Sequence, residues 1–213
     1  MLLILCRVLF GMKVHGLNHV PPKGPLVVVS NHLHNADPLL VCVACPRPVH
    51  FMAKKELMAV PLIGRIIRFG GGFPVDRGKA DRQAIQLAAE HLRQEVAVGM
   101  FPEGTRSVSR TIERALPGAG LIALRGNAPI LPVAIVGSEE LPFNGAKQLR
   151  GKQDRADRRR GVTITFGEPF MLETKPDGKR MTPEEAINVA MERVAALLPE
   201  EYRGIFGGDT RAG

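Results

Sequence analysis

Apolar positions along this chain form short runs that alternate with longer helical patterns. The short runs are rich in Val, Ile and Leu and are bounded by turn residues, which predicts buried strands. Strands are expected over 12–20, 26–30, 49–53, 98–102, 130–136 and 162–166, with a further one ending in 73–77. Helices are expected from residue 38 onward, over 80–96, over 116–125 and from 183 to 198.

This alternation of strands and helices predicts an α/β fold with a mostly parallel mixed sheet flanked by helices in a single domain. The clearest helix start is a capping box formed by Thr182 and Glu185, with Pro183 at the first helical position. An apolar run at 57–64 is interrupted by proline and glycine. The pattern contains no internal repeat and no linker that would divide the chain.

The main domain is expected to cover residues 12–200, a length sufficient to bury a core of its own. Residues 201–213 are expected to form a tail, and residues 1–11 an N-terminal apolar helix. That helix contains Arg7 and is shorter than the ~20 residues that span a bilayer. It also lacks the charged start and cleavage site of a secretory signal. An interfacial membrane anchor and a helix packed on the domain both fit it.

The net charge of the chain is +8, with one Tyr and no Trp. The scarcity of aromatic stacking platforms argues against a nucleic-acid partner. A basic surface instead fits anionic lipid or phosphorylated small molecules. The most basic segment, 147–160, contains seven Lys or Arg and two Asp, which predicts a solvated loop within reach of an anionic membrane surface.

The three cysteines, Cys6, Cys42 and Cys45, do not form a disulfide framework, because their number is odd and two lie in a predicted helix. Reduced thiols are typical of a cytosolic environment. Cys42 and Cys45 have CxxC spacing, but no second pair exists to complete a zinc site. We therefore expect them to be small buried apolar residues.

The segment from Asn31 to Pro38 carries the strongest chemical signal. His32 follows a predicted strand directly, and Asp37 stands just before a proline in a favourable N-cap position, with Pro38 at the first helical position. On one helix His32 and Asp37 would lie about 140° apart, whereas a strand-to-helix turn would let them meet. A carboxylate bonded to one imidazole nitrogen fixes the tautomer and leaves the other nitrogen as a general base. The pair predicts activation of a substrate hydroxyl.

A second cluster, Phe101-Pro102-Glu103-Gly104-Thr105-Arg106-Ser107, also follows a predicted strand. Arg suits bidentate recognition of phosphate, and Gly lets backbone approach a ligand closely. Thr105 and Ser107 add hydroxyl donors. Taken alone, the cluster is more often a solvated turn with an Arg–Glu pair.

Taken in order, these clusters resemble those of a known family. The sequence Asn31-His32 with Asp37 is followed by Gly71-Gly72-Phe73-Pro74-Val75-Asp76-Arg77, then by residues 101–107 and by Pro129-Ile130-Leu131-Pro132-Val133. This arrangement closely resembles the glycerolipid acyltransferase family, and within it the bacterial 1-acyl-sn-glycerol-3-phosphate acyltransferases. The resemblance covers roughly residues 12 to 200 and implies a glycerol-3-phosphate acyltransferase-like fold.

The resemblance implies specific roles for these residues. His32 and Asp37 match the catalytic dyad, and the acceptor's phosphate would be bound by the Glu-Gly-Thr-Arg block. The residues implied for phosphate binding are Glu103, Gly104, Thr105, Arg106 and Arg77, with Asn31, Asp76 and Ser107 as further members of the site.

The implied reaction moves a fatty acyl group from acyl-CoA or acyl carrier protein to the sn-2 hydroxyl of 1-acylglycerol-3-phosphate (lysophosphatidic acid). The product is phosphatidic acid, an intermediate of phospholipid biosynthesis. The reaction uses no cofactor and no metal, and the enzyme is expected at the cytoplasmic face of the cell membrane, as a peripheral or monotopic protein. The chain has no GxSxG element, so direct transfer is favoured over an acyl-enzyme. Oxyanion donors could be backbone N–H groups at a helix start, but the sequence does not identify them.

One departure from the family concerns the acceptor. Many relatives have an aromatic–Lys pair before the Gly of the helix that follows FPEGTRS, whereas this chain has Leu116-Pro117-Gly118. Arg114 or Arg110 could supply the missing cation. The same chemistry on glycerol-3-phosphate or on a hydroxylated membrane lipid is therefore an alternative.

Two further interpretations belong to other functional classes. His32-x-His34-x-x-Asp37 faintly resembles the HxHxDH of metallohydrolases, but the final His is missing. A catalytically silent module that binds anionic lipid would not need the His–Asp pair. His34 is expected to form a wall of the site. The other histidines are expected to be surface or packing residues: His15, His19, His50 and His91.

Overall fold

The computed structural model describes residues 11–76, 81–142, 161–173 and 178–208. Within these residues the centre is one seven-stranded sheet with strand order β1-β7-β6-β2-β5-β3-β4. The strands are β1 (Lys13–His15), β2 (Leu26–Ser30), β3 (Val49–Lys54), β4 (Phe73–Val75), β5 (Ala97–Met100), β6 (Ile130–Val136) and β7 (Thr163–Phe166). Neighbouring strands are parallel except for β6 and β7. The predicted mostly parallel mixed sheet is confirmed.

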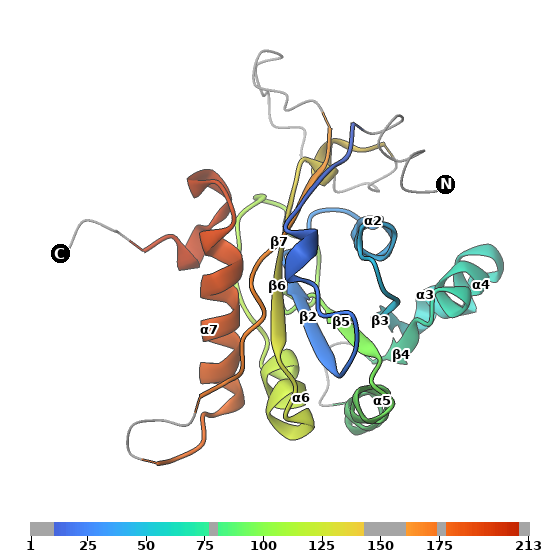
Figure 1. Ribbon diagram of the computed structural model, residues 1–213. Helices are drawn as coiled ribbons and strands as arrows, with labels where there is room; N and C mark the ends of the chain where they lie inside the picture. Colours follow the sequence, from blue (N-terminus) through green and yellow to red (C-terminus); the bar gives the residue numbers. More distant parts are fainter. Residues whose placement is uncertain (1–10, 77–80, 143–160, 174–177, 209–213) are drawn as a thin grey trace.

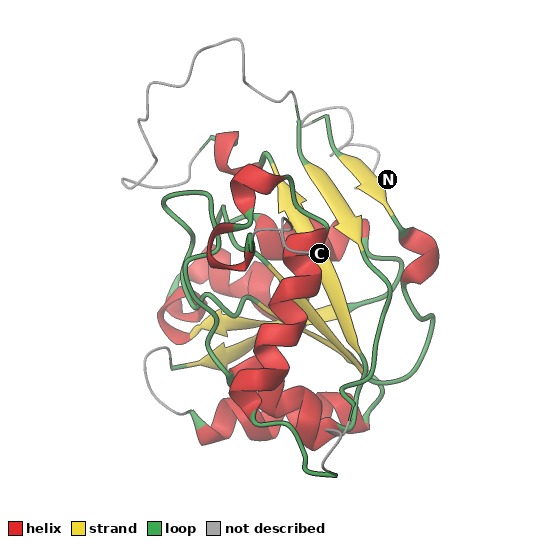
Figure 2. Cartoon of the chain, turned by 90° about the vertical axis from the view of Figure 1, so that its left-hand side faces the viewer, coloured by secondary structure: helices red, strands yellow, loops and turns green. Residues whose placement is uncertain are grey.

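Helices cover both faces of this sheet. They are α2 (Asp37–Ala44), α3 (Lys55–Ala59), α4 (Pro61–Phe69), α5 (Arg82–Arg93), α6 (Gly118–Gly126) and α7 (Pro183–Ala196). Figure 1 shows α7 on one side of the sheet and α2 on the other, with the α3–α4 pair projecting beyond the β3–β4 edge. Figure 2, viewed from the side of α7, shows this helix lying across the sheet. The predicted capping box at Thr182 and Glu185 begins α7.

The alternation of side chains along β2 divides the core into two layers. Every residue of β2 is buried. Val27 and Val29 pack in the layer under α5, α6 and α7, whereas Leu26 and Val28 pack in the layer under α2. A strand buried on both faces is characteristic of a parallel sheet covered by helices. This burial fixes the position of the residues that follow β2.

Several predicted boundaries shift for local reasons. The strand expected over 12–20 is only β1, because Gly16 adopts a left-handed φ of 71° and a 3-10 turn over Leu17–His19 follows. The helix expected over 116–125 begins at Gly118, because Pro117 disfavours helical backbone at Leu116; the Leu116 N–H donates to the Pro102 carbonyl at 2.8 Å. The interrupted apolar run at 57–64 contributes to two short helices, the second of which has its proline in the first turn.

The packed part of the chain extends beyond residue 200. Tyr202 is buried, and its hydroxyl donates to Glu139 Oε1 at 2.6 Å. The predicted N-terminal helix and the basic segment 147–160 lie outside the described residues. Among the helices that are described, none has the length and apolar character needed to cross a membrane.

Candidate active site

The loop from the end of β2 to the start of α2 brings His32 and Asp37 together. The Nδ1–H of His32 donates to Asp37 Oδ2 over 2.9 Å, so the contact predicted from the sequence is present. His32 is 5% exposed and Asp37 is completely buried. Because the carboxylate accepts from Nδ1, that nitrogen carries the proton and the Nε2 lone pair can accept one.

Asp37 has a different relation to its helix from the one predicted. Helix α2 begins at Asp37 itself, and Ala36 occupies the N-cap position without a side-chain bond. Oδ2 of Asp37 instead accepts from the backbone N–H groups of Leu33 and His34, at 2.7 and 2.6 Å. The carboxylate therefore organises the loop that precedes the helix, and the same oxygen holds the His32 ring.

This loop uses its own N–H groups at the helix start, where the sequence suggested oxyanion donors. The backbone N–H groups of Leu33 and His34 donate to the Asp37 carboxylate, and that of Ala36 donates to His34 Nδ1 at 3.0 Å. The backbone N–H of Asp37 donates to the His34 carbonyl. These bonds lie within the loop itself, so they fix the imidazole without help from a ligand.

Phe101 positions the face of the His32 ring. The two ring centroids are 4.1 Å apart with an interplanar angle of 20°, and Phe101 in turn stacks on Phe51 of β3 at 5.1 Å. Stacked rings restrict rotation of the imidazole about its side-chain bonds. The sequence placed Phe101 in the FPEGTRS cluster but gave it no role.

The loop after β5 contacts the backbone of His32 at both its N–H and its carbonyl. The N–H of His32 donates to Glu103 Oε1 at 2.8 Å, and the His32 carbonyl accepts from the N–H of Ser107 at 2.7 Å. β2 and β5 are parallel neighbours, so their carboxyl ends lie at the same edge of the sheet. The two clusters that the sequence identified are thus joined at His32.

Glu103 is buried, with 3% of its surface exposed. Burial raises the pKa of its carboxyl to about 8, although the hydrogen bond from His32 acts in the opposite direction. A buried side chain bonded to a neighbouring backbone is suited to support the catalytic loop. This geometry favours a positioning role for Glu103 over the phosphate contact expected from the sequence.

The other residues of the 103–107 loop differ in exposure. Thr105 is exposed, and Arg106 and Ser107 are half-buried. The Ser107 hydroxyl donates to the Thr111 carbonyl at 2.8 Å. Gly104 has a φ of +69°, and a side chain added there would come within 2.7 Å of Leu116 Cδ1. The glycine therefore lets Leu116 cover the loop closely.

The two cations suggested as replacements for the family's Lys have distinct surroundings. Arg114 Nε donates to the Glu103 carbonyl at 2.8 Å and thereby stabilises the loop. Arg110 directs Nη1 toward Glu139 Oε1, 3.9 Å away. Of the two, Arg114 is the one bonded to the predicted phosphate-binding block.

His34 is buried beside Asp37. Burial lowers the pKa of His34; the Asp37 carboxylate opposes this effect and the Arg106 charge adds to it. Arg106 is thus close enough to act on the dyad's neighbourhood electrostatically. Across the described ranges, no three His, Cys, Asp or Glu side chains are grouped to hold a metal ion.

The Asn31 side chain is bonded to β6, and Asp76 follows β4, a strand that does not neighbour β2. The Asn31 side chain donates to the Ile135 carbonyl and accepts from the Ile135 N–H, both at 2.8 Å, which ties the end of β2 to β6. Asp76 is exposed after β4, three strand spacings or about 14 Å from β2 along the sheet. Its N–H donates to Asp81 Oδ2. Arg77 lies outside the described residues.

The remaining histidines and cysteines have packing or surface surroundings. His50 and His91 pack edge to face at 4.9 Å, His15 is exposed, and His19 Nδ1 lies 2.9 Å from the Phe166 carbonyl. Cys45 is buried, as predicted, whereas Cys42 is half-buried with its thiol directed at the Val49 carbonyl. Burial raises the pKa of Cys42 to about 11, which disfavours a reactive thiolate.

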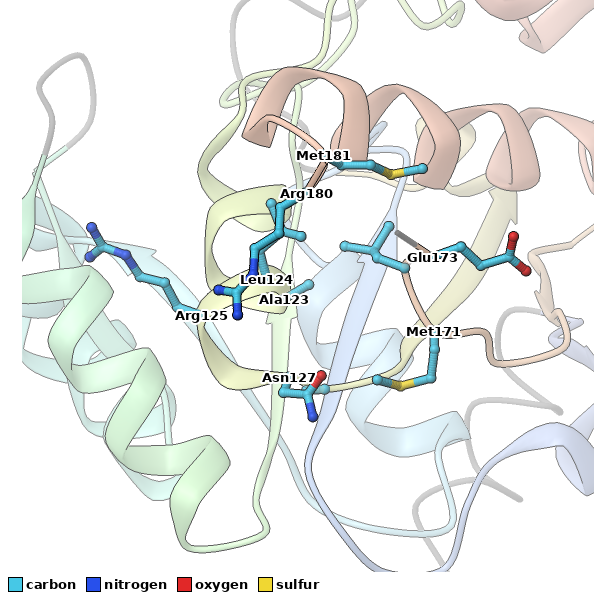
Figure 3. Close-up of a pocket in the computed structure, with 10 residues that line it drawn as sticks. Ala123, Leu124, Arg125, Asn127, Met171, Glu173, Arg180 and Met181 are labelled. Carbon is cyan, nitrogen blue, oxygen red and sulfur yellow. The ribbon is translucent and has the colours of Figure 1, made fainter. Parts of the chain in front are cut away.

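A pocket of about 690 Å³ lies at the opposite end of the parallel strands from His32. It is lined by the C-terminal end of α6 and the segments before α7, including Arg125, Met171 and Arg180 (Figure 3). In the parallel β2–β6 pair Val27 is opposite Ile130, so the α6–β6 connection lies at the amino end of β2. His32 follows the carboxyl end. The pocket is therefore separate from the His–Asp pair.

The part of the chain from just before β1 to the end of β6 matches a known protein family. A family model described as Acyltransferase matches residues 11–136, and the chain belongs to this family. Family membership confirms the resemblance stated from the sequence.

Particular relatives carry more specific names. A protein of Mycoplasma genitalium called "Probable 1-acyl-sn-glycerol-3-phosphate acyltransferase" is 39% identical over 137 residues, 60% of this chain and 50% of the relative. The 1-acyl-sn-glycerol-3-phosphate acyltransferase of Bacillus subtilis is 34% identical over 129 residues, 60% of this chain and 63% of the relative. The chain thus spans between half and just under two thirds of the length of these proteins.

A solved structure extends the similarity across most of the fold. The crystal structure of the 1-acyl-sn-glycerophosphate (LPA) acyltransferase from Thermotoga maritima superposes with a TM-score of 0.63 at 26% sequence identity. The match covers 87% of this chain and 70% of that chain. The α/β fold described above is therefore shared with an enzyme of this family.

Proposed function

We propose that this protein transfers a fatty acyl group from an acyl thioester to the sn-2 hydroxyl of 1-acylglycerol-3-phosphate, giving phosphatidic acid. The carrying observation is the 2.9 Å contact between His32 and Asp37, held against the 103–107 loop by two hydrogen bonds to the His32 backbone. The names of the relatives support the acceptor.

In this mechanism His32 Nε2 takes the proton of the acceptor hydroxyl as its oxygen attacks the thioester carbonyl carbon. The tetrahedral intermediate collapses, the carbon–sulfur bond breaks and the thiolate leaves. The imidazolium returns its proton to the thiolate, so that the products are an ester and a free thiol. Asp37 stabilises the imidazolium and keeps the proton-bearing Nδ1 oriented.

Arg106 would bind the acceptor's phosphate. A guanidinium forms charge-assisted hydrogen bonds with phosphate oxygens, and this one belongs to the loop that contacts the His32 backbone. Binding the phosphate there would bring the glycerol hydroxyl close to the base. Thr105, Gly104 and Arg77 are the further contacts expected at this phosphate.

The choice of acceptor depends on the surface next to this loop. Leu116 covers Gly104 in the segment that stands in place of the family's aromatic–Lys pair, and Arg114 bonds the Glu103 carbonyl. An apolar side chain there favours an acceptor that carries an acyl chain beside its phosphate. Lysophosphatidic acid has both features, whereas glycerol-3-phosphate lacks the chain.

The net charge of the chain favours an anionic acyl carrier and an anionic membrane surface. Acyl-CoA and acyl carrier protein are both anionic, and a chain with a net charge of +8 attracts either carrier. The same charge favours an anionic membrane, in which a two-tailed product would remain. We expect the protein to work at the cytoplasmic surface of the cell membrane.

Product analysis tests the proposal. Purified protein is incubated with an acyl-CoA and one acceptor in each of three parallel reactions. The acceptors are lysophosphatidic acid, glycerol-3-phosphate and neutral lysophospholipid, and products are identified by mass spectrometry. Phosphatidic acid should form from lysophosphatidic acid at the highest rate, together with one free thiol per ester.

One histidine variant tests the catalytic base and a second serves as its control. His32→Ala should abolish turnover, whereas the exposed His15→Ala should leave it unchanged. A folded His32→Ala variant with wild-type activity would remove His32 from the mechanism. A higher rate on glycerol-3-phosphate or neutral lysophospholipid would assign a different acceptor.

A further inference from the structure

The α3–α4 hairpin exposes an unusual concentration of large apolar side chains. Leu62 is 69% exposed, Ile66 52% and Phe69 96%. The complete group of exposed large apolar residues in this hairpin is Leu57, Val60, Leu62, Ile63, Ile66 and Phe69. Elsewhere in the described residues such side chains occur singly along the sequence, which is normal for a soluble surface. This patch therefore calls for a partner.

The hairpin holds α4 so that its apolar stripe points away from the domain. Gly64 is the buried residue of α4, and a side chain there would come within 2.1 Å of the Met58 carbonyl of α3. At 100° per residue, Leu62, Ile66 and Phe69 fall within an arc of about 60° on the face opposite Gly64. The contact that anchors α4 thus directs its stripe outward.

Two arginines of α4 lie on one side of this stripe, and two lysines precede the helix in the hairpin. Arg65 and Arg68 are exposed on α4, and Lys54 and Lys55 are exposed at the start of α3, against the single carboxylate of Glu56. Arg68 also donates to the Met58 carbonyl at 3.0 Å, so it helps to fix the hairpin. An apolar stripe bordered by Lys and Arg is typical of a helix that lies in the interface of an anionic membrane.

The hairpin begins at the carboxyl ends of the strands, where the catalytic residues also lie. α3 follows the carboxyl end of β3, which is parallel to β5, and β5 leads to the 103–107 loop. Figure 1 shows α4 as the outermost element beyond β3 and β4. The hairpin and the loop that carries His32 therefore both follow the carboxyl ends of parallel strands.

We propose that the α3–α4 hairpin is a membrane-docking surface, with Leu62, Ile66 and Phe69 inserted among lipid chains and Arg65 contacting anionic headgroups. The lipid contact itself is independent of the reaction. Its use for delivering a lipid acceptor to His32 rests on the proposed function.

The absence of tryptophan from the chain allows a site-specific test. A single Trp is introduced as Phe69→Trp or, as a matched control, as Ile205→Trp, since Ile205 is 64% exposed beside α7. Both full-length variants are titrated with phosphatidylcholine vesicles that contain or lack phosphatidylglycerol. Trp at 69 should shift to shorter wavelength with anionic vesicles, and Trp at 205 should not.

Charge variants measure the contribution of each part to vesicle co-sedimentation. Phe69→Glu should weaken partitioning by about tenfold or more, because an inserted aromatic side chain is lost. Arg65→Gln should weaken it about fivefold on anionic vesicles only. Ile205→Glu should have no effect. Circular dichroism checks that each variant keeps the fold.

Three results would overturn the proposal. The protein does not sediment with anionic vesicles, or it sediments while the emission wavelength of the Phe69→Trp variant stays unchanged. In the third, the Phe69→Trp variant is a dimer whose emission already lies at shorter wavelength without lipid. The last result would assign the hairpin to a contact between two copies. His32→Ala is measured in parallel without substrate. Its undiminished binding with lost turnover would separate docking from catalysis, and normal binding without any acyl transfer in the wild type would contradict the proposed function alone.

Discussion

The backbone N–H of His32 donates a 2.8 Å hydrogen bond to Oε1 of the buried Glu103, a residue 71 positions further along the chain. This bond joins the loop that carries the base to the loop that carries Arg106. The Ser107 N–H completes the connection by donating to the His32 carbonyl. The position of the imidazole therefore depends on both loops.

Replacing Glu103 should change kcat more than the acceptor KM. Glu103→Ala leaves the His32 N–H without its partner, and displacement of the base should lower kcat by about 100-fold. Glu103→Gln retains an oxygen that can accept and should keep most of the activity. Steady-state kinetics with varied lysophosphatidic acid measures the split. A normal kcat with a raised acceptor KM would instead support the phosphate-binding role suggested by the sequence.

The stability of the protein should fall with rising pH because of Glu103. The pKa of this carboxyl is raised to about 8 in the folded protein, above its ordinary value of 4.5. Folded protein therefore holds a proton that unfolded protein releases between about pH 4.5 and 8, and the free energy of unfolding decreases across that window. The slope attributable to Glu103 approaches about 1.4 kcal/mol per pH unit.

Urea unfolding of wild type and Glu103→Gln between about pH 5 and 9 measures this slope, because the glutamine variant has no proton to release at this position. Subtracting the two curves cancels the other titrating groups. Parallel curves would show that Glu103 does not bind a proton on folding, and a difference that grows in the opposite direction would mean that it ionises more easily when folded.

Asp37→Asn should lower kcat by about 10⁴-fold, as for the corresponding carboxylate of a serine protease triad. The amide oxygen can still accept from the loop, but an amide neither stabilises the imidazolium nor secures the required tautomer. Glu184→Gln, which neutralises an exposed carboxylate on α7, is the control and should be silent. Turnover at saturating substrates measures both. A mild loss in a folded Asp37→Asn variant would limit Asp37 to organising the loop.

Arg106→Ala should raise the KM for lysophosphatidic acid by about 10- to 100-fold, the equivalent of a charge-assisted hydrogen bond. The KM for the acyl thioester should change little if the contact is with the acceptor's phosphate. Arg125→Ala is the matched control, because Arg125 lines the pocket at the amino ends of the strands, away from His32. Equal increases for donor and acceptor would assign Arg106 to a general electrostatic effect.

Much of the fold could be predicted because its signals are local. The apolar run of β6 matched the observed strand at both ends, and the capping box fixed the start of α7. Contacts between distant segments are not encoded in this way. The N–H of Leu116, just before α6, donates to the Pro102 carbonyl, which neighbours it only after the chain has folded.

The candidate site divides in the same way. The sequence alone determined which residue types could act as base and orienting acid, because His32 and Asp37 flank one turn between a strand and a helix. Only the tertiary structure decided that Glu103 supports the His32 backbone, that Asn31 ties β2 to β6 and that α4 presents an apolar stripe outward. Those outcomes depend on which strands become neighbours and which helix faces stay uncovered. Long-range packing fixes both, whereas the order of residues along the chain specifies only local geometry.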